Sequence, residues 1–156
     1  MKRKNISKEE ALLAMADLCA RSEQCEFDIV RKLRLKMLPM SSIFEIIDYL
    51  KENRYIDADR YASGFANDKV RFSAWGRLKI RAALIAKKIP SHSIQTALDN
   101  IDESDYADAL RRAVNAKIRS VDLNVYEDRM KMYRYLMSRG FESALIGRAL
   151  KALMKN

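Results

Sequence analysis

Few residues of this chain have the types and spacing that catalysis needs. His92 is the only histidine, and no second histidine or cysteine stands at metal-ligand spacing from it. Cys19 and Cys25 lie six residues apart, which matches neither a zinc motif nor a redox motif. Asp57 and Asp59 could pair as carboxylates, but acids at this place are better explained as the start of a helix. The four glycines are isolated and form no phosphate-binding loop, so we predict a non-enzyme without cofactor or metal site.

Basic side chains are the chemistry that the sequence does repeat. In the helix predicted after Gly76, Arg77, Arg81 and Lys88 follow one face, and the helices predicted at 25–36 and after residue 128 are basic too. Basic residues in such a run usually form a helix face that is exposed to solvent and binds nothing. Here acids are scarce nearby, and stacked helices would align the charges into a stripe that binds phosphates or acidic side chains. The predicted partner-binding or DNA-binding residues are Arg31, Lys32, Lys36, Arg71, Arg77, Arg81, Lys87 and Lys88.

The overall charge favours the same kind of partner. Lys and Arg number 30 against 21 Asp and Glu, which gives a net charge of +9 and an isoelectric point near 9.6. This suits nucleic acid or an acidic protein surface, although many small soluble proteins are basic without binding either. The apolar runs are too short for a membrane span, the N-terminal stretch lacks a secretory core, and the cysteines suit a reducing compartment. We therefore expect a cytoplasmic monomer that does not enter a membrane.

An internal repeat indicates which helices position these side chains. The stretches Leu33–Ile47, Leu84–Leu98 and Leu136–Leu150 share one pattern at offsets of 51 and 52 residues. Each has a leucine, then a basic residue three positions on, and later an isoleucine with apolar partners three, four and seven residues further. That spacing places the apolar side chains on one face of a helix. A fixed period of this length indicates stacked repeats, each too small to bury its own core fully.

The predicted fold is all-α, with nine helices in three tandem three-helix repeats. We place the repeats at 1–54, 55–101 and 102–156, and we expect Leu33 and its two counterparts to be buried at equivalent places. The stretch 120–126 is predicted to be a linker or a loose helix start. The predicted helix caps are Ser7, Cys25, Asp57, Gly76, Ser91, Asp102, Asp128 and Ser143.

The centre of the chain combines several residues at fixed spacing. It reads YIDADRYASGF from Tyr55 to Phe65, followed by Arg71 and then by WGRLKIRAALIAKKI from Trp75 to Ile89. The flanking stretches FDIVRKL and MYRYLMSRGF agree with it, so the pattern covers nearly all of the chain. Together these stretches resemble the RecX family, bacterial regulators of the RecA recombinase. The most specific positions of the central signature are Asp57, Arg60, Tyr61, Ala62, Phe65, Gly76, Arg77 and Ile80.

The resemblance implies an elongated, curved array of three helical repeats without catalytic residues. It implies binding to the RecA–DNA filament along its helical groove, and inhibition of ATP hydrolysis, strand exchange or filament growth. Such an activity belongs to homologous recombination, DNA repair and the SOS response. Some members of the family modulate in the other direction, and many bind single- or double-stranded DNA directly.

The chain departs from the family pattern at turns and caps. The family usually has glycine where this chain has Met37 and Lys88, and only Gly140 keeps it, so the first two corners are expected to turn without a left-handed glycine. Cys25 stands where the first repeat commonly has serine. Ala58 stands where a second acid usually follows the aspartate of the signature. These changes affect local stability more than the fold or the partner.

Two other functions stay open at this point. The chain could be a nucleic-acid-binding module that acts by itself, or a helical scaffold for an unrelated protein. The central signature favours the recombinase regulator over the scaffold. The regulator and the DNA-binding module would both use the basic stripe, so the sequence does not choose between them.

Overall fold

The computed structural model describes residues 5–154, and the basic start of the N-terminal stretch, like the last two residues, lies outside the described residues. Within this range the chain forms α-helices, one short 3-10 helix (η1, Ile118–Ser120) and no strand. The α-helices are α1 (Lys8–Arg21), α2 (Glu26–Leu35), α3 (Met40–Glu52), α4 (Ala58–Ser73), α5 (Arg77–Ala86), α6 (Ser91–Asp99), α7 (Glu103–Lys117), α8 (Tyr126–Ser138) and α9 (Ser143–Met154).

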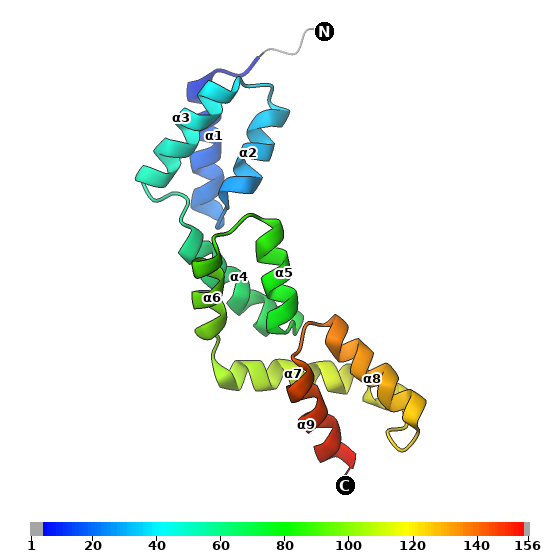
Figure 1. The fold of residues 1–156 in the computed structure, drawn as a ribbon. Helices are drawn as coiled ribbons and strands as arrows, with labels where there is room; N and C mark the ends of the chain where they lie inside the picture. The colour runs from blue at the N-terminus through cyan, green and yellow to red at the C-terminus, as the bar shows by residue number, and fades with distance from the viewer. Residues whose placement is uncertain (1–4, 155–156) are drawn as a thin grey trace.

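The helices are arranged in groups of three along an elongated molecule. Figure 1 shows α1–α3 at one end, α4–α6 in the middle and α7–α9 at the other end, so the two termini lie far apart. The predicted all-α array of three tandem three-helix repeats is therefore confirmed. No helix between residues 5 and 154 is long and apolar enough to cross a membrane.

Two separate hydrophobic cores hold the array together. The first repeat has its own core, which includes Ile29, Leu33, Ile43 and Leu50. A second, larger core runs through α4–α9 and also includes Cys25, which precedes α2. Leu33, Leu84 and Leu136 are all fully buried, as the repeat pattern predicts. The second and third repeats therefore form one body, and the first repeat packs against it.

Side-chain caps explain several of the helix starts. Ser7, Asp57 and Asp102 each accept a hydrogen bond from the backbone N–H three residues further on, at 3.1, 2.9 and 2.9 Å. These bonds satisfy donors that have no partner inside the helix. Cys25 and Gly76 also stand at the predicted cap positions, but they make no side-chain cap bond. The sequence thus located these five starts correctly.

Three predicted caps are wrong. Pro90 holds the cap position of α6, and Ser91 is the first residue of the helix. α8 begins ahead of Asp128, whose carboxylate instead accepts a hydrogen bond from the backbone N–H of Asp122 at 2.8 Å. Ser143 is likewise the first residue of α9. The two serines miss the cap by one residue, which is within the usual uncertainty of a helix boundary. Asp128 lies in the first turn of α8, where an acid is favoured as it is at a cap.

The corners between the second and third helices of each repeat share one backbone conformation. Met37, Lys88 and Gly140 occupy equivalent places with φ angles of +62°, +60° and +96°. The first two corners therefore keep the left-handed turn although they lack glycine. That conformation costs a residue with a Cβ about 1–2 kcal/mol. The structure also places Ala74, which ends α4, in the left-handed region.

Candidate polyanion-binding surface

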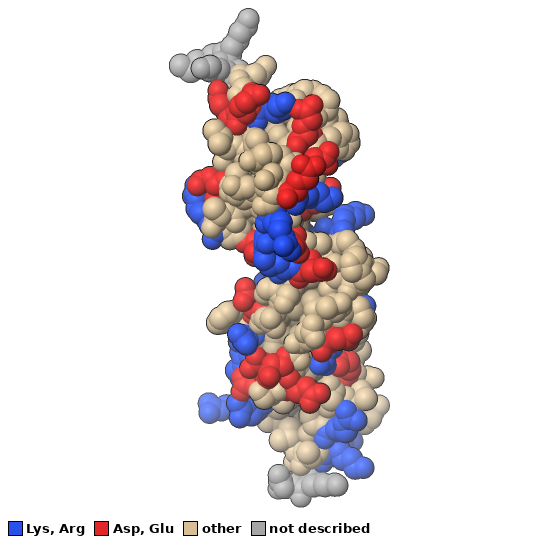
Figure 2. Space-filling view, turned by 90° about the vertical axis from the view of Figure 1, so that its left-hand side faces the viewer, with Lys and Arg blue, Asp and Glu red and all other residues tan. Residues whose placement is uncertain are grey.

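The predicted basic residues differ in what they contact. Figure 2 shows one face of the molecule, on which Lys and Arg are interspersed with Asp and Glu. Four of the eight predicted cations make contacts with another element of the chain, namely Arg71, Arg77, Arg81 and Lys87. These contacts divide the predicted basic residues into two groups: residues that connect one helix or loop to another, and residues that remain available to a partner.

Arg77 joins three elements. Its Nη1 donates to Glu142 Oε2 at 3.0 Å, and its guanidinium lies 3.9 Å from the centre of the Tyr106 ring. The backbone N–H of Arg77 donates to Tyr106 Oη at 3.1 Å, and the Tyr106 hydroxyl donates to Glu142. Burial, reinforced by the bond to Glu142, raises the pKa of Tyr106 above its ordinary value. Acids are scarce near Arg77 in the sequence, but the structure pairs it with Glu142, which lies just before α9 and outside the helix that carries the arginine.

The backbones of the second and third repeats touch beside this network. The N–H of Gly76 donates to the carbonyl of Arg139 at 2.8 Å, and the N–H of Leu78 donates to the carbonyl of Gly140 at 2.9 Å. A Cβ added at Gly76 would lie 2.3 Å from the Gly140 carbonyl. Only glycine therefore fits at this contact. The glycine of the signature serves to join two repeats rather than to bind a ligand.

Arg71 and Arg81 also bridge helices but remain more open. Arg71 Nε donates to Asp105 Oδ2 at 2.9 Å, which links α4 to α7. Arg81 Nη2 donates to Gln95 Oε1 at 2.9 Å, which links α5 to α6. The side chain of Arg71 is 57% exposed, so its pair with Asp105 is largely screened by water.

Lys87 holds the first repeat to the second. Its Nζ donates to both carboxylate oxygens of Asp28 on α2, at 2.8 and 2.9 Å. Asp28 is only 14% exposed and lies 3.7 Å from Arg31 as well. Partial burial opposes ionisation of Asp28, but hydrogen bonds from Lys87 and Cys25 and the charge of Lys87 outweigh it, so the pKa falls below its ordinary value. The pair is a polar clamp on the junction between the two bodies.

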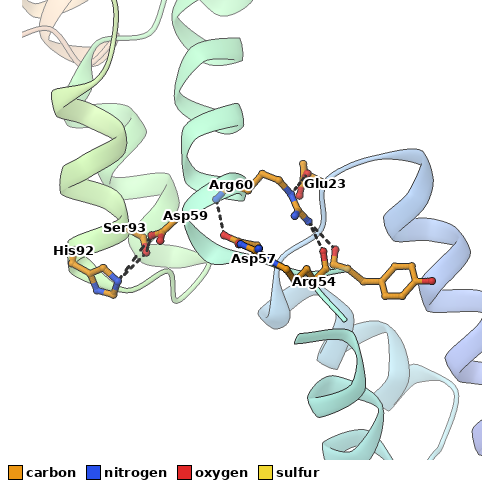
Figure 3. Close-up of polar contacts among 8 residues, drawn as sticks. Glu23, Arg54, Asp57, Asp59, Arg60, His92 and Ser93 are labelled. Carbon is orange, nitrogen blue, oxygen red and sulfur yellow. Dashed lines mark hydrogen bonds and ion pairs between the residues drawn. The ribbon is translucent and has the colours of Figure 1, made fainter. Parts of the chain in front are cut away.

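Arg60 forms a second clamp on this junction (Figure 3). Its Nε donates to Glu23 of the first repeat, and its Nη2 donates to the carbonyls of Arg54 and Tyr55 at 3.0 and 3.2 Å. The interaction with Glu23 raises the pKa of Arg60 above its ordinary value. Arg60 belongs to the central signature, and the linker that it fixes follows α3. The sequence marked this residue as specific without showing what it contacts.

The carboxylates considered as a pair belong to separate contacts (Figure 3). Asp57 caps α4, and the backbone N–H of Arg60 lowers its pKa. Asp59 accepts a hydrogen bond at 2.5 Å from Ser93 on α6. His92 Nε2 lies 4.0 Å from Asp59 at the exposed surface. These contacts join α4 to α6, and they place the two acids in different surroundings.

The side chains of the remaining predicted residues form no hydrogen bond or ion pair with another helix among residues 5–154; Arg31, Lys36 and Lys88 are exposed, and Lys32 is half-buried. Lys32, Lys36 and Lys88 have no carboxylate within 4.0 Å in the part of the chain that the structure describes. Arg31 is 63% exposed, and its nearest carboxylate, Asp28, is also bound by Lys87. Arg31, Lys87 and Lys88 line one groove at the junction of the first and second repeats. Two further cations line the same groove but were not among the predicted site residues: Arg34 and Lys51.

Sequence comparison identifies relatives of the chain. The family model described as "RecX, second three-helix domain" matches residues 59–98, and "RecX, third three-helix domain" matches residues 103–150, together more than half of the chain. A "Regulatory protein RecX" from Clostridium beijerinckii is 30% identical over 132 residues, which are 83% of this chain and 61% of that protein. The protein of the same name from Clostridium botulinum, strain Alaska E43, is 32% identical over 86% of this chain and 64% of its own. The chain thus spans somewhat less than two thirds of the length of these relatives.

Solved structures share the fold at lower sequence identity. A crystal structure of regulatory protein RecX matches with a TM-score of 0.80 and 22% identity, over 93% of this chain and 71% of that one. The crystal structure of RecX from Lactobacillus salivarius matches with a TM-score of 0.77 and 19% identity, over 96% and 97%. The two repeat models, the curated relatives and the shared array of helices agree: the chain belongs to the RecX family of regulatory proteins.

Proposed function

We propose that this protein binds the RecA–DNA filament in the cytoplasm and inhibits its ATP hydrolysis and strand exchange during homologous recombination and DNA repair. The observation that carries the proposal is the match of residues 59–98 and 103–150 to two successive RecX repeats. The relatives are named regulatory proteins, which supports a role without catalysis of its own.

The shape and charge of the molecule support this proposal. An array of helices in a line offers a long surface to a polymer, and binding along several subunits of a filament multiplies weak contacts. Arg31, Lys36 and Lys88 are exposed and Lys32 is half-buried, and none of the four is bound to another helix between residues 5 and 154, so they are available to phosphates or acidic side chains. We propose that they contact the filament. We assign Arg71, Arg77, Arg81 and Lys87 first to holding the repeats in place.

The ATPase activity of the cognate recombinase tests the proposal. Hydrolysis that depends on single-stranded DNA is measured while this protein is titrated into preformed filaments. We expect the rate to fall as the protein approaches stoichiometric amounts. An unchanged rate at those amounts would exclude inhibition, and a higher rate would show modulation in the opposite direction.

A second function is a DNA-binding module that acts without the recombinase. The observation that favours it is the net charge of +9, together with three lysines that carry no ion pair among residues 5–154. Anisotropy of labelled single- and double-stranded DNA, measured across a salt series, separates this function from filament binding. Affinity for naked DNA equal to the affinity for the filament would favour the module.

A further inference from the structure

A groove of about 570 Å³ lies where the first repeat meets the second. Its apolar lining includes Phe27 and Val30 of α2, Ile56 of the linker, and Ile89 and Pro90 of the corner between α5 and α6. The side chain of Phe27 leaves 38% of its surface open to water. Concave sites of this size with an apolar lining commonly bind ligands, and an exposed aromatic side chain is a typical anchor for a partner.

The rim of the groove is positively charged. Its two carboxylates are already engaged, because Glu26 lies 3.0 Å from Lys51 and Asp57 caps α4. Arg34 and Lys88 have no carboxylate within 4.0 Å among the described side chains. The cations that line the groove are Arg31, Arg34, Lys51, Lys87 and Lys88. A bound partner would therefore need negative charge to match the rim.

Lys88 stands at a strained position on this rim. Its φ angle is +60°, and the equivalent position of the third repeat is Gly140. Glycine adopts this conformation at no steric cost, whereas lysine does not. Met37 has the same conformation at the equivalent corner of the first repeat, so the conformation belongs to the repeat and fixes where Lys88 stands. The lysine places a positive charge beside Ile89 and Pro90.

We infer that this groove binds an acidic segment of a partner protein, with apolar side chains seated against Phe27 and Ile89 and carboxylates facing Arg34 and Lys88. The inference rests on the proposed function and names the kind of element that the partner presents. A nucleic-acid strand matches the groove less well. Its phosphates would meet the rim, but the only aromatic ring in the lining is Phe27, and single-strand sites use several rings for base stacking.

Labelled peptides test the groove without the recombinase. The probe is a short fluorescein-labelled peptide with leucines at helical spacing and glutamates between them. One comparison peptide has lysine for every glutamate, and another has serine for every leucine. In anisotropy titrations we expect the first peptide to bind about tenfold more tightly than either comparison, a difference of about 1.4 kcal/mol. Equal binding of the serine peptide would overturn the inference, because the apolar lining would then contribute nothing.

Variants of the protein locate the binding. The double change Arg34→Glu and Lys88→Glu is expected to lower the affinity for the first peptide about tenfold. Phe27→Ser is expected to lower this affinity by a similar factor. Arg148→Glu, an exposed change on α9 at the far end of the molecule, is the matched control and should leave affinity unchanged. Amide chemical shifts of the unmodified protein should change at 27–34 and 87–89. Shifts confined to other helices, or displacement of the peptide by single-stranded DNA at lower concentration, would contradict a protein-binding groove.

The same variants separate this inference from the proposed function. If the unmodified protein lowers recombinase ATPase but binds no acidic peptide, the groove assignment fails and the regulatory function stands. If the peptide binds in the groove while the ATPase is unaffected, the groove stands and the regulatory function fails. If both hold, Arg34→Glu with Lys88→Glu should require about tenfold more protein for the same inhibition.

Discussion

Lys88 and Met37 show that a left-handed corner can be built without glycine. Each adopts φ near +60° at the end of the second helix of its repeat. The change Lys88→Gly removes the contact between Cβ and backbone, while it increases the freedom of the unfolded chain. The first effect stabilises the folded protein by about 1–2 kcal/mol, and the second destabilises it by about 0.5–1 kcal/mol. We expect a net gain of about 0.5–1 kcal/mol in the free energy of unfolding by urea. A loss of stability would show that the lysine side chain compensates for its backbone.

Asp28 gives the junction a predictable dependence on pH. Its pKa is lowered in the folded state, so the folded protein binds fewer protons than the unfolded chain around this pKa. The contribution of Asp28 is therefore fully present above its ordinary value of 3.8 and is lost as pH falls through the lower folded pKa. Asp28→Asn should destabilise the protein by about 1–3 kcal/mol near neutral pH.

The measurement for Asp28 is the free energy of unfolding of both proteins from neutral pH downward. The two curves should converge as the pH falls below the ordinary range of aspartate. Glu9→Gln, an exposed change in the first turn of α1, serves as the control for loss of one carboxylate. Coincident curves for the native protein and Asp28→Asn would mean that the pair with Lys87 contributes nothing, and a constant offset would mean that its contribution does not depend on ionisation of Asp28.

Residue contacts close in sequence were predictable, and distant ones were not. The cap at Asp57 follows from local preference, because its partner is the N–H three residues on. The role of Arg77 was missed because Glu142 lies 65 positions away, beyond any helical spacing. No local pattern carries that information. The central signature did single out Arg60 and Arg77, the two arginines that hold the junctions.

At the scale of elements, Gly76 and Gly64 provide a matched pair of substitutions. A Cβ at Gly76 would lie 2.3 Å from the backbone of Gly140, so Gly76→Ala must push the second and third repeats apart. Nothing lies within 4 Å of a Cβ at Gly64, which is inside α4. We expect Gly76→Ala to cost about 1–3 kcal/mol by overpacking. Gly64→Ala should stabilise by about 0.5–1 kcal/mol because alanine favours the helix.

Thermal melts of the two glycine variants check the sign of each effect. The melting temperature should fall for Gly76→Ala and rise for Gly64→Ala. A Gly76→Ala protein as stable as the native one would mean that the repeats separate without cost. The helical signal in circular dichroism of both variants should stay close to native at low temperature.

The repeat pattern located the elements better than it described their packing. The same buried place in each repeat is occupied by Leu33, Leu84 and Leu136, because the apolar face of an amphipathic helix packs toward the core. The pattern did not show that α4–α9 share one core while α1–α3 have another. That division depends on contacts such as the one between Gly76 and Gly140, which unite residues far apart in the chain.

At the scale of the molecule, we propose repeat boundaries near residues 54 and 101, with unequal coupling across them. The first junction is held by the clamps of Lys87 and Arg60 between separate cores. The second lies inside a shared core. Native-state amide hydrogen exchange should therefore report one free energy of opening for the amides of α1–α3 and a different one for the amides of α4–α9. A single value throughout the chain would contradict the division, and three values would show that the second and third repeats open separately.

The most direct test of the central claim is the recombinase ATPase in the presence of this protein. Filaments of the cognate recombinase on single-stranded DNA should lose ATPase activity as the native protein is added. Lys32→Glu with Lys36→Glu changes two lysines that form no ion pair in the described structure, so the fold should persist while inhibition needs more protein. Arg148→Glu should inhibit like the native protein. An ATPase rate that stays constant up to stoichiometric amounts of native protein would contradict regulation of the filament.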